Sequence, residues 1–317
     1  MRVVVTGGAG FIGANVVRGL VDHGPHDVVV LDDLSTGCRS NLEGVGGVCV
    51  IEGSVLDRDA LDEACSGADA VIHLAARPSV PRSIADPVAT HHANATGTLE
   101  VLEAVRRAGG PYLVVSSSSS VYGANPVLPK REGLEPRPMS PYAASKLAAE
   151  SYALSHAACF DLRVLVFRFF NVYGPGQLAN HSYAAVVPAF ISAALRKDPL
   201  TIYGDGHQTR DLTFVGTLVD VLVTAVEQQI TSASPVNLAF GSRASLLEVA
   251  SLLEEIVGVP LKRNHLGARP GEVRDSQGDN TLMRSLFPEA RPVDLRDGLA
   301  TTVEWHRKLK ADTLEAR

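Results

Sequence analysis

The sequence predicts an α/β fold, in which a doubly wound parallel sheet carries helices on both faces and a smaller α/β lobe follows. Short runs of β-branched and apolar residues alternate with helical patterns through the first 170 residues. These runs are apolar at nearly every position, which is typical of strands that are buried on both faces. A glycine-rich turn at residues 7–13 joins the first run to the first helical pattern. Together, these observations indicate the doubly wound sheet.

The elements follow one another regularly at first. Strands are expected at residues 3–6, 27–32, 48–53, 70–75, 112–116 and 163–169, and helices at residues 11–23, 59–64, 95–108 and 142–160. Gly24 and Gly109 follow two of these helices, where a left-handed C-terminal cap favours glycine. After about residue 170 the regular alternation of strands and helices ends. Helices are expected at residues 186–196, 218–228, 245–257 and 297–309, a strand that could return to the main sheet at 236–240, and an irregular segment at 261–279.

Composition excludes several classes of protein. The 317 residues are 45% hydrophobic and 20% charged, with a net charge of −6, which argues against a general nucleic-acid binder. No apolar stretch approaches the ~20 residues that a membrane span requires. The first strand begins at once, which leaves no room for a signal peptide. The four cysteines are scattered and no His, Cys or carboxylate spacing suggests a metal site, so a cytoplasmic protein without a metal is expected.

The glycine-rich turn has the spacing of a dinucleotide-binding loop. Gly7, Gly10 and Gly13 allow a tight turn, a close approach of a pyrophosphate and close packing of helix on strand. The N–H groups that begin the helix can bind the phosphates. A plain tight turn would also fit, but the second strand ends in Asp32 and Asp33, where a carboxylate can bind the adenosine ribose. Such a carboxylate repels a 2′-phosphate, so NAD is favoured over NADP, although Arg39 lies close in sequence.

A tyrosine and a lysine at helical spacing suggest a catalytic pair. Tyr142 and Lys146 are four residues apart and share a helical face, with Ser140 as N-cap and Pro141 in the first turn. A free tyrosine has a pKa of about 10, and a neighbouring ammonium favours the phenolate, as the positive ring of NAD⁺ would. A tyrosine and a lysine at this spacing by themselves are more often surface packing.

Five consecutive serines supply a third candidate. Residues 116–120 follow an apolar strand and precede a turn, so they lie at the carboxyl end of that strand, where open α/β sheets bind ligands. Ser118 could share the proton of a substrate hydroxyl with Tyr142.

The chain resembles the NAD-dependent epimerase/dehydratase family of extended short-chain dehydrogenases/reductases, whose members include UDP-galactose 4-epimerase. The resemblance covers nearly the whole chain. Its motifs are TGGAGFIG at 6–13, VVVLDDLSTG at 28–37, HLAA at 73–76, NATGT at 94–98, SSSSSVYG at 116–123, SPYAASK at 140–146, RFFNVYGPGQ at 168–177, IYGDGHQTRD at 202–211 and RPGEVRDS at 269–276.

The resemblance implies a Rossmann-type NAD-binding domain at residues 1–170, with a return at about 212–240, and a nucleotide-sugar-binding lobe at 171–211 and 241–317. It implies Ser118, Tyr142 and Lys146 as the catalytic triad. The residues that it places at tightly bound NAD are Gly7, Gly10, Phe11, Ile12, Gly13, Asp32, Asp33, Ser54, Val55, Leu74, Ala75, Ala76, Asn94, Tyr142 and Lys146. Relatives usually have Asp at the position of Ser54, so the contact with adenine there is weaker or absent.

The resemblance also implies a set of substrate contacts. These residues are Ser79, Ser83, Ser118, Ser119, Ser120, Asn171, Val187, Tyr203, Arg210, Arg269 and Ser276. Asn171, Arg210 and Arg269 match residues that hold the nucleotide diphosphate, a task that suits guanidinium groups. If the resemblance is set aside, the two arginines are more simply interpreted as charged side chains exposed to solvent.

Two serines guide the choice of reaction. Related 4,6-dehydratases have an Asp-Glu pair at the positions of Ser119 and Ser120, and decarboxylases usually keep the glutamate, so both reactions are disfavoured. An isomerase, a nucleotide-sugar 4-epimerase that works through a 4-keto intermediate, remains. Ser276 lies where relatives restricted to glucose and galactose carry tyrosine, so UDP-GlcNAc/UDP-GalNAc is ranked first and UDP-glucose/UDP-galactose second.

Several alternatives stay open. The substrate could be UDP-glucuronate or a dTDP- or GDP-sugar, the enzyme could be a dehydratase, and a non-catalytic NAD-sensing scaffold is the remote alternative. Uronic acid 4-epimerases also use small residues near the serines, but the Thr and Arg that they carry downstream are Asn171 and Leu178 here. The family also implies a homodimer that pairs the helices expected at 95–108 and 142–160. No nucleic-acid or membrane partner is expected.

Overall fold

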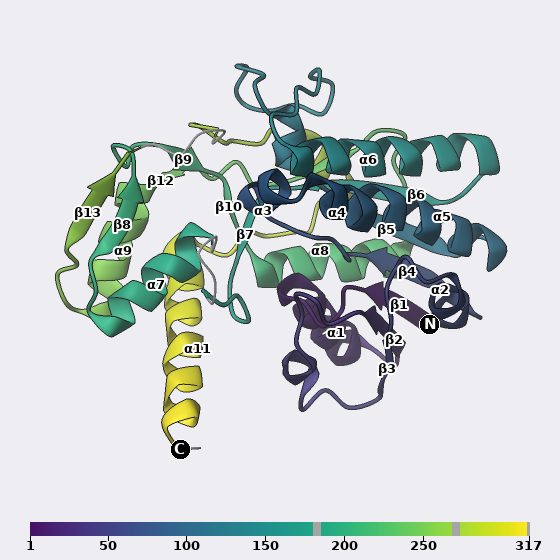
Figure 1. Ribbon diagram of the computed structural model, residues 1–317, viewed down its shortest axis with the longest axis horizontal. Coiled ribbons are helices and arrows are strands. Elements are labelled where there is room, and N and C mark those ends of the chain that lie inside the picture. The colour runs from purple at the N-terminus through teal and green to yellow at the C-terminus, as the bar shows by residue number, and fades with distance from the viewer. Residues whose placement is uncertain (180–184, 268–272, 316–317) are drawn as a thin grey trace.

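A seven-stranded sheet forms the centre of the computed structural model, which describes residues 1–179, 185–267 and 273–315 (Figure 1). Every pairing in this sheet is parallel, and the strand order is β11-β6-β5-β4-β1-β2-β3. The strands are β1 (Arg2–Thr6), β2 (Asp27–Asp32), β3 (Val48–Glu52), β4 (Ala70–His73), β5 (Tyr112–Ser118), β6 (Val164–Phe169) and β11 (Val236–Leu238). The order reverses between β1 and β4, and open sheets bind ligands at such a switch point. The predicted doubly wound sheet is confirmed.

Helices cover both faces of the sheet (Figure 1). On one face lie α1 (Phe11–His23) and α8 (Val215–Gln228), which approach closely because Gly19 has no side chain. A Cβ atom at Gly19 would lie 2.2 Å from a methyl group of Val219. On the other face lie α2 (Arg58–Cys65), α5 (Gly97–Arg107) and α6 (Pro141–Phe160). Their apolar sides pack on buried strand residues such as Leu113 and Val166.

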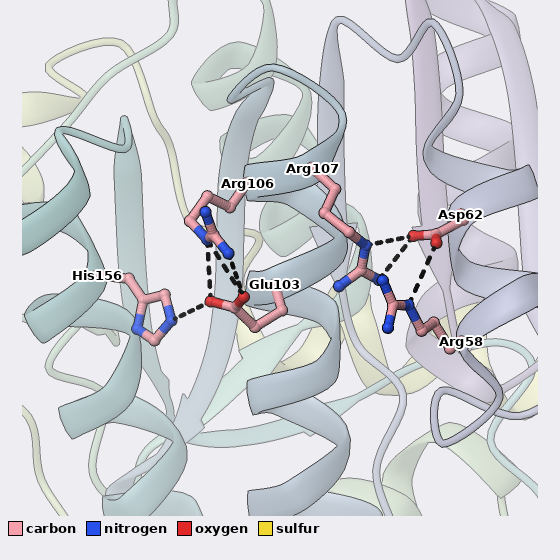
Figure 2. A network of polar contacts seen from close by, with 6 residues as sticks. All are labelled: Arg58, Asp62, Glu103, Arg106, Arg107 and His156. Carbon is pink, nitrogen blue, oxygen red and sulfur yellow. Dashed lines mark hydrogen bonds and ion pairs between the residues drawn. The ribbon is translucent and has the colours of Figure 1, made fainter.

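Ion pairs link these three helices on their solvent side (Figure 2). Glu103 on α5 accepts from Arg106 at 2.8 Å and lies 3.3 Å from the ring of His156 on α6. Asp62 on α2 contacts Arg107 of α5 at 2.6 Å and Arg58 at 3.7 Å. Because exposed pairs contribute little free energy, the buried apolar side chains hold the helices in place.

The second lobe has its own core. Its main elements are α7 (Val186–Arg196), β8 (Leu200–Tyr203), α9 (Leu246–Val257), β13 (Arg263–Leu266) and α11 (Leu295–Glu315). Their apolar residues form one cluster that includes Phe190, Leu253 and Val303. Ser245 caps α9 in a reciprocal box with Glu248, which satisfies two free N–H groups at the start of the helix.

Short elements connect the sheet to this lobe. Two strand pairs cross the junction, β7 (Asn171–Tyr173) with β10 (Leu212–Phe214) and β9 (Thr209–Arg210) with β12 (Ala244–Ser245). The short helices are α3 (Val80–Ala85), α4 (Pro87–His91) and α10 (Thr281–Leu286), and single turns of 3₁₀ or π helix lie at Arg39–Leu42, His92–Thr96 and Ser119–Tyr122.

Most expected elements are found to within a few residues, and the strand expected at 236–240 does return to the main sheet as β11, beside β6. Two local expectations are wrong. The segment at 261–279 contains β13, because its four exposed residues pair with β8 in a register that their side chains do not reveal. Gly24 has φ of −178°, which is extended backbone, whereas Gly109 has the expected positive φ of +90°.

A buried histidine at the end of β4 predicts acid sensitivity. His73 is 2% exposed, and its ring nitrogens lie 2.7 Å from the hydroxyl of Thr6 and 2.9 Å from that of Thr98. Burial, aided by the charge of Lys146, lowers the pKa of His73 from 6.5 to about 3. The unfolded chain therefore binds a proton that the folded chain excludes, and the free energy of unfolding should fall as the pH drops from 6.5 toward 3.

The test is a urea titration at pH 7 and pH 5 of His73→Gln and of a control, His91→Gln, at an exposed histidine. We expect His73→Gln to lose less stability between the two pH values than the control loses. Equal losses in the two variants would contradict the assignment.

Candidate functional site

A cavity of about 2030 Å³ runs along the carboxyl ends of the strands on both sides of the switch point. Its lining comes from segments that are far apart in sequence: residues 7–13, 31–41, 53–56, 74–93, 116–123, 139–146, 169–178, 203, 210 and 273–276 all contribute. The glycine-rich turn, the serine run and the Tyr142–Lys146 face therefore open into one space.

The glycine-rich turn forms one end of the cavity. Gly7 has φ of +72°, and a Cβ atom there would lie 2.6 Å from the backbone nitrogen of Ala75. A Cβ atom at Gly13 would lie 2.1 Å from the carbonyl oxygen of Gly7. Only glycine fits either position. The helix α1 begins at Phe11 with no side chain capping its first turn, so its free N–H groups point at this part of the cavity, as an anion site requires.

Two carboxylates follow the end of β2. Asp32 accepts from the backbone N–H groups of Ala9 and Leu34, both at 2.9 Å, and burial raises the pKa of its carboxyl despite these bonds. Asp33 accepts from the N–H of Ser35 at 2.9 Å. Both aspartates line the cavity, so the bonds that orient them leave their carboxylates at its wall. A ribose with two free hydroxyls suits such a wall.

The remaining predicted cofactor contacts fall into two groups. Phe11, Ile12, Ser54, Val55, Leu74, Ala75 and Ala76 line the cavity together with the glycines. Asn94 does not line it. Asn94 is 1% exposed, and its side-chain amide accepts from the N–H of Arg77 at 2.7 Å and donates to the hydroxyl of Ser145 at 3.0 Å. Its amide also donates to the carbonyl oxygen of Arg77 at 3.2 Å, and its place at the cofactor stays a prediction.

The helix α6 places the tyrosine and the lysine. Ser140 accepts from the N–H of Ala143 at 3.1 Å, and Pro141 occupies the first turn, so the helix begins immediately before Tyr142. The ammonium of Lys146 donates to the carbonyl oxygen of Ser116 at 3.0 Å, and burial lowers the pKa of Lys146 to about 8. This bond ties the helix to the end of β5.

Ser118 faces the tyrosine from the strand. The hydroxyl of Ser118 lies 2.9 Å from that of Ser120 and accepts from the Ser120 N–H at 3.2 Å. Burial raises the pKa of the Tyr142 phenol, and the hydrogen bond with Ser118 opposes that rise. The net direction is therefore opposite to the shift toward the phenolate that the sequence predicts from a neighbouring ammonium.

A buried ion pair lies one helical turn beyond Lys146 on α6. Glu150, one helical turn beyond Lys146, accepts from Arg168 of β6 at 2.6 and 2.9 Å. It also accepts from the hydroxyl of Ser117 at 2.8 Å. The side chains of the pair are 3% and 5% exposed. Sequence reasoning missed this pair, although the four-residue spacing from Lys146 to Glu150 shows that Glu150 shares the inner face of the helix.

The predicted substrate contacts are only partly brought together. Ser79, Ser118, Ser119, Ser120, Asn171, Tyr203, Arg210 and Ser276 line the cavity. Ser83 does not, because it is fully buried and donates to the carbonyl oxygen of Val80 at 2.7 Å. Val187 lines a smaller adjoining cavity of about 230 Å³. Arg269 lies outside the described residues.

The part of the chain that the structure describes offers neither a metal-binding cluster nor a membrane-spanning helix. No group of three or more His, Cys, Asp or Glu side chains in these residues is placed to hold a metal ion. Among the described helices, none has both the length and the apolar character needed to cross a membrane.

Comparison with known proteins identifies the family of this chain. The NAD dependent epimerase/dehydratase family matches residues 3–239. A UDP-glucose 4-epimerase from Mycolicibacterium smegmatis is 37% identical over 97% of this chain and 99% of its own length. A solved UDP-N-acetylglucosamine 4-epimerase from Methanobrevibacter ruminantium M1 superposes with a TM-score of 0.91 at 33% identity, over 97% of this chain and 98% of that one.

A third relative is a UDP-glucuronic acid 4-epimerase from Bacillus cereus, solved in complex with UDP-glucuronic acid and NAD. It superposes with a TM-score of 0.89 at 31% identity and covers 98% of this chain and all of its own. The family match spans well over half of the chain, and the relatives cover nearly all of it. This chain belongs to the NAD dependent epimerase/dehydratase family.

Proposed function

We propose that this protein is an NAD-dependent 4-epimerase that interconverts the C4 epimers of a UDP-hexose. One observation carries the proposal: Ser118, Tyr142 and Lys146 line the same cavity as the glycine-rich turn, and the positions beside Ser118 hold Ser119 and Ser120. A serine hydroxyl cannot supply the carboxylate acid and base that a dehydratase needs. Inversion at C4 needs removal and return of a proton and a hydride; the three residues can transfer the proton, and NAD, when bound, would accept and return the hydride.

The protein fits NAD at the turn end of the cavity. Gly7 and Gly13 leave no room for a Cβ atom, the free N–H groups of α1 suit a pyrophosphate, and Asp32 and Asp33 line the wall where a ribose would lie. NAD, when bound, supplies the acceptor for the C4 hydride and gives it back. Since it is regenerated in each turnover, we expect it to stay bound.

The chain's own residues handle the proton of the sugar O4 hydroxyl. Tyr142 takes this proton as general base, and Ser118, hydrogen-bonded to the phenol, orients the hydroxyl. Lys146 lies one helical turn beyond Tyr142 and anchors α6 to Ser116. After the 4-keto sugar has turned over and hydride has returned to the opposite face of C4, the same tyrosine returns the proton to O4.

The nucleotide end of the substrate is assigned to the junction of the two lobes. Asn171 and Arg210 line the cavity there, and Arg269 is the third candidate by resemblance. A guanidinium can bind phosphate oxygens through two parallel bonds, so the diphosphate can be held while the sugar turns.

The test is an NMR assay of the purified protein with UDP-GlcNAc, UDP-GalNAc, UDP-glucose, UDP-galactose and UDP-glucuronate, with dTDP- and GDP-hexoses as further substrates. For the UDP-hexoses, we expect inversion at C4 without elimination of water from the sugar. A 4-keto-6-deoxy product would show a dehydratase. Purified protein that carries no NAD and converts none of these sugars would overturn the proposal.

The sugar preference is expected to depend on Ser276. This small residue lines the cavity and leaves room for a 2-acetamido group. We therefore expect Ser276→Tyr to lower kcat/KM for UDP-GlcNAc by at least about tenfold, since one misfitting group costs on the order of 1–3 kcal/mol, while UDP-glucose turnover changes little. Ser276→Ala is the size-matched control. If Ser276→Tyr lowered kcat/KM equally for both sugars, Ser276 would not determine the sugar preference.

A homodimer formed through α5 and α6 is also proposed, by resemblance to the family. It is supported by two large apolar side chains that α6 leaves exposed, Tyr152 and Phe160, at 43% and 49%. We expect light scattering to give twice the mass of 33.5 kDa, and Tyr152→Glu to shift the protein toward monomer. A cytoplasmic location stays a prediction.

A further inference from the structure

A fully buried carboxylate lies at the junction of the two lobes and has no role in the steps above. Asp211 connects β9 to β10, is 0% exposed and does not line the cavity. Its neighbour Arg210 does line it. Burying a charge without solvent is costly, so a carboxylate at this position needs strong compensation from its surroundings.

Within the described residues, that compensation comes from hydrogen-bond donors. The backbone N–H of Gly278 donates to one carboxylate oxygen of Asp211 at 2.9 Å. The hydroxyl of Ser242 lies 3.2 Å from the other oxygen and 3.0 Å from the carbonyl oxygen of Leu212. The backbone N–H groups of Phe240 and Gly241 also donate to the carboxylate. One side chain therefore connects β9–β10 to the loop after β11 and to the segment that follows Ser276.

The backbone of Asp211 reaches a third segment. Its carbonyl oxygen accepts from the backbone N–H of Asn171 at 3.1 Å and from the side-chain amide of Asn171 at 3.2 Å. This bond holds the Asn171 amide, which lines the cavity. On the other side, the N–H of Ser276 donates to the carbonyl oxygen of Thr209 at 3.1 Å. Asn171, Arg210 and Ser276, the three described residues that the proposed function assigns to the substrate here, all lie within two residues of these bonds.

The partners of Asp211 have little freedom to move. A Cβ atom at Gly278 would lie 2.5 Å from the methyl group of Ala239 and 3.0 Å from the ring of Phe170, so the backbone is packed tightly there. Phe170 itself lines the cavity. Because the surroundings are rigid, the carboxylate fixes how the segments lie relative to one another. Without it, the segments could take several arrangements.

We propose that Asp211 is a positioning residue that fixes Asn171, Arg210 and Ser276 around the nucleotide sugar by joining the segments that carry them. The inference rests on the proposed function, because it assumes that a nucleotide sugar binds at this junction. Asp211 does not touch the reacting atoms, so its loss should weaken substrate binding much more than it slows the chemical step.

The charge of the carboxylate provides the sharpest test. Burial raises the pKa of Asp211 to about 6, so it is ionised at pH 7.5. An ionised carboxylate only accepts hydrogen bonds, which matches partners that donate. Asn has nearly the same shape, but its NH₂ group would face an N–H donor. Asp211→Asn therefore keeps the volume of the side chain but places a donor where the surrounding donors need an acceptor.

The experiment measures KM, kcat, bound NAD and the Kd of UDP, which lacks the sugar, for the wild-type protein and Asp211→Asn at pH 7.5. We expect KM for the UDP-sugar and the Kd of UDP to rise by about tenfold or more, as the loss of one or two hydrogen bonds implies, with kcat within about threefold and NAD content unchanged. Asp198→Asn is the matched control, since Asp198 is an exposed member of a surface pair with Arg196 in the same lobe.

Several outcomes would contradict the role of Asp211. A KM and a UDP Kd in Asp211→Asn within twofold of wild type would overturn the inference, as would a fall in kcat with KM unchanged. If Asp211→Asn does not fold, Ser242→Ala removes one donor, and the same split between KM and kcat, smaller in size, is expected; an unchanged KM there would overturn the inference. Failure of the wild-type protein to bind UDP would instead contradict the proposed function.

Discussion

Replacing Tyr142 with phenylalanine is expected to lower the rate of C4 inversion by about 10²–10⁴-fold, the usual contribution of a positioned general base. Phenylalanine keeps the ring at the cavity wall but has no hydroxyl to take the O4 proton. Because the substitution leaves the glycine-rich turn and the lobe junction intact, NAD content and the affinity for UDP should stay the same. The measurement is the initial rate by NMR, together with NAD released on denaturation.

The same helix offers a matched control. Tyr152 lies on α6 with 43% of its surface exposed, and Tyr152→Phe makes the same chemical change away from the cavity. We expect Tyr152→Phe to retain the wild-type rate. A Tyr142→Phe variant as active as Tyr152→Phe would show that another group removes the proton.

Replacing Arg168 with methionine is expected to lower the free energy of unfolding by about 3–5 kcal/mol, because one charge of a buried pair is left without its partner. Among the donors that the structure describes, the carboxylate of Glu150 would keep the hydroxyl of Ser117. Arg168 also donates to the carbonyl oxygen of Glu132 at 3.1 Å, and its guanidinium stacks 4.7 Å from the centre of the Tyr122 ring. The measurement is the midpoint and slope of urea unfolding.

Two further variants separate the charge effect from the loss of side-chain packing. Arg196→Met removes the arginine of an exposed pair and should cost less than about 1 kcal/mol. The double variant Arg168→Met with Glu150→Leu replaces both buried charges with apolar groups and should recover most of the loss. A single variant Arg168→Met as stable as Arg196→Met would mean that the buried pair contributes nothing to stability.

Much of the fold was accessible from the sequence because its signals are local. The alternation of apolar strands with helical periods needs only neighbouring residues, and it predicted the parallel sheet and the helices within a few residues. The glycine-rich turn is equally local, since the steric demand at Gly7 and Gly13 follows from the strand that precedes them and the helix that follows. The four-residue spacing of Tyr142 and Lys146 likewise placed both on the wall of the cavity.

Interactions between distant segments could not be predicted in this way. Ser83 and Asn94 have the residue types of contact residues, but their burial and their bonds to Val80 and Arg77 appear only in the folded chain. The strand β13 consists of four exposed residues with no apolar alternation, and only pairing with β8 defines it.

The sequence by itself determined the fold class, the glycine-rich turn and the helix that carries Tyr142 and Lys146, because each depends on a repeat or spacing within one segment. Only the tertiary structure decided which polar groups are buried and with which partners. The Glu150–Arg168 pair joins residues 18 positions apart, and Asp211 meets Gly278 across 67 positions. The physical reason is that a pKa or a hydrogen bond depends on the solvent and the donors around a group, which are set when separate segments pack together.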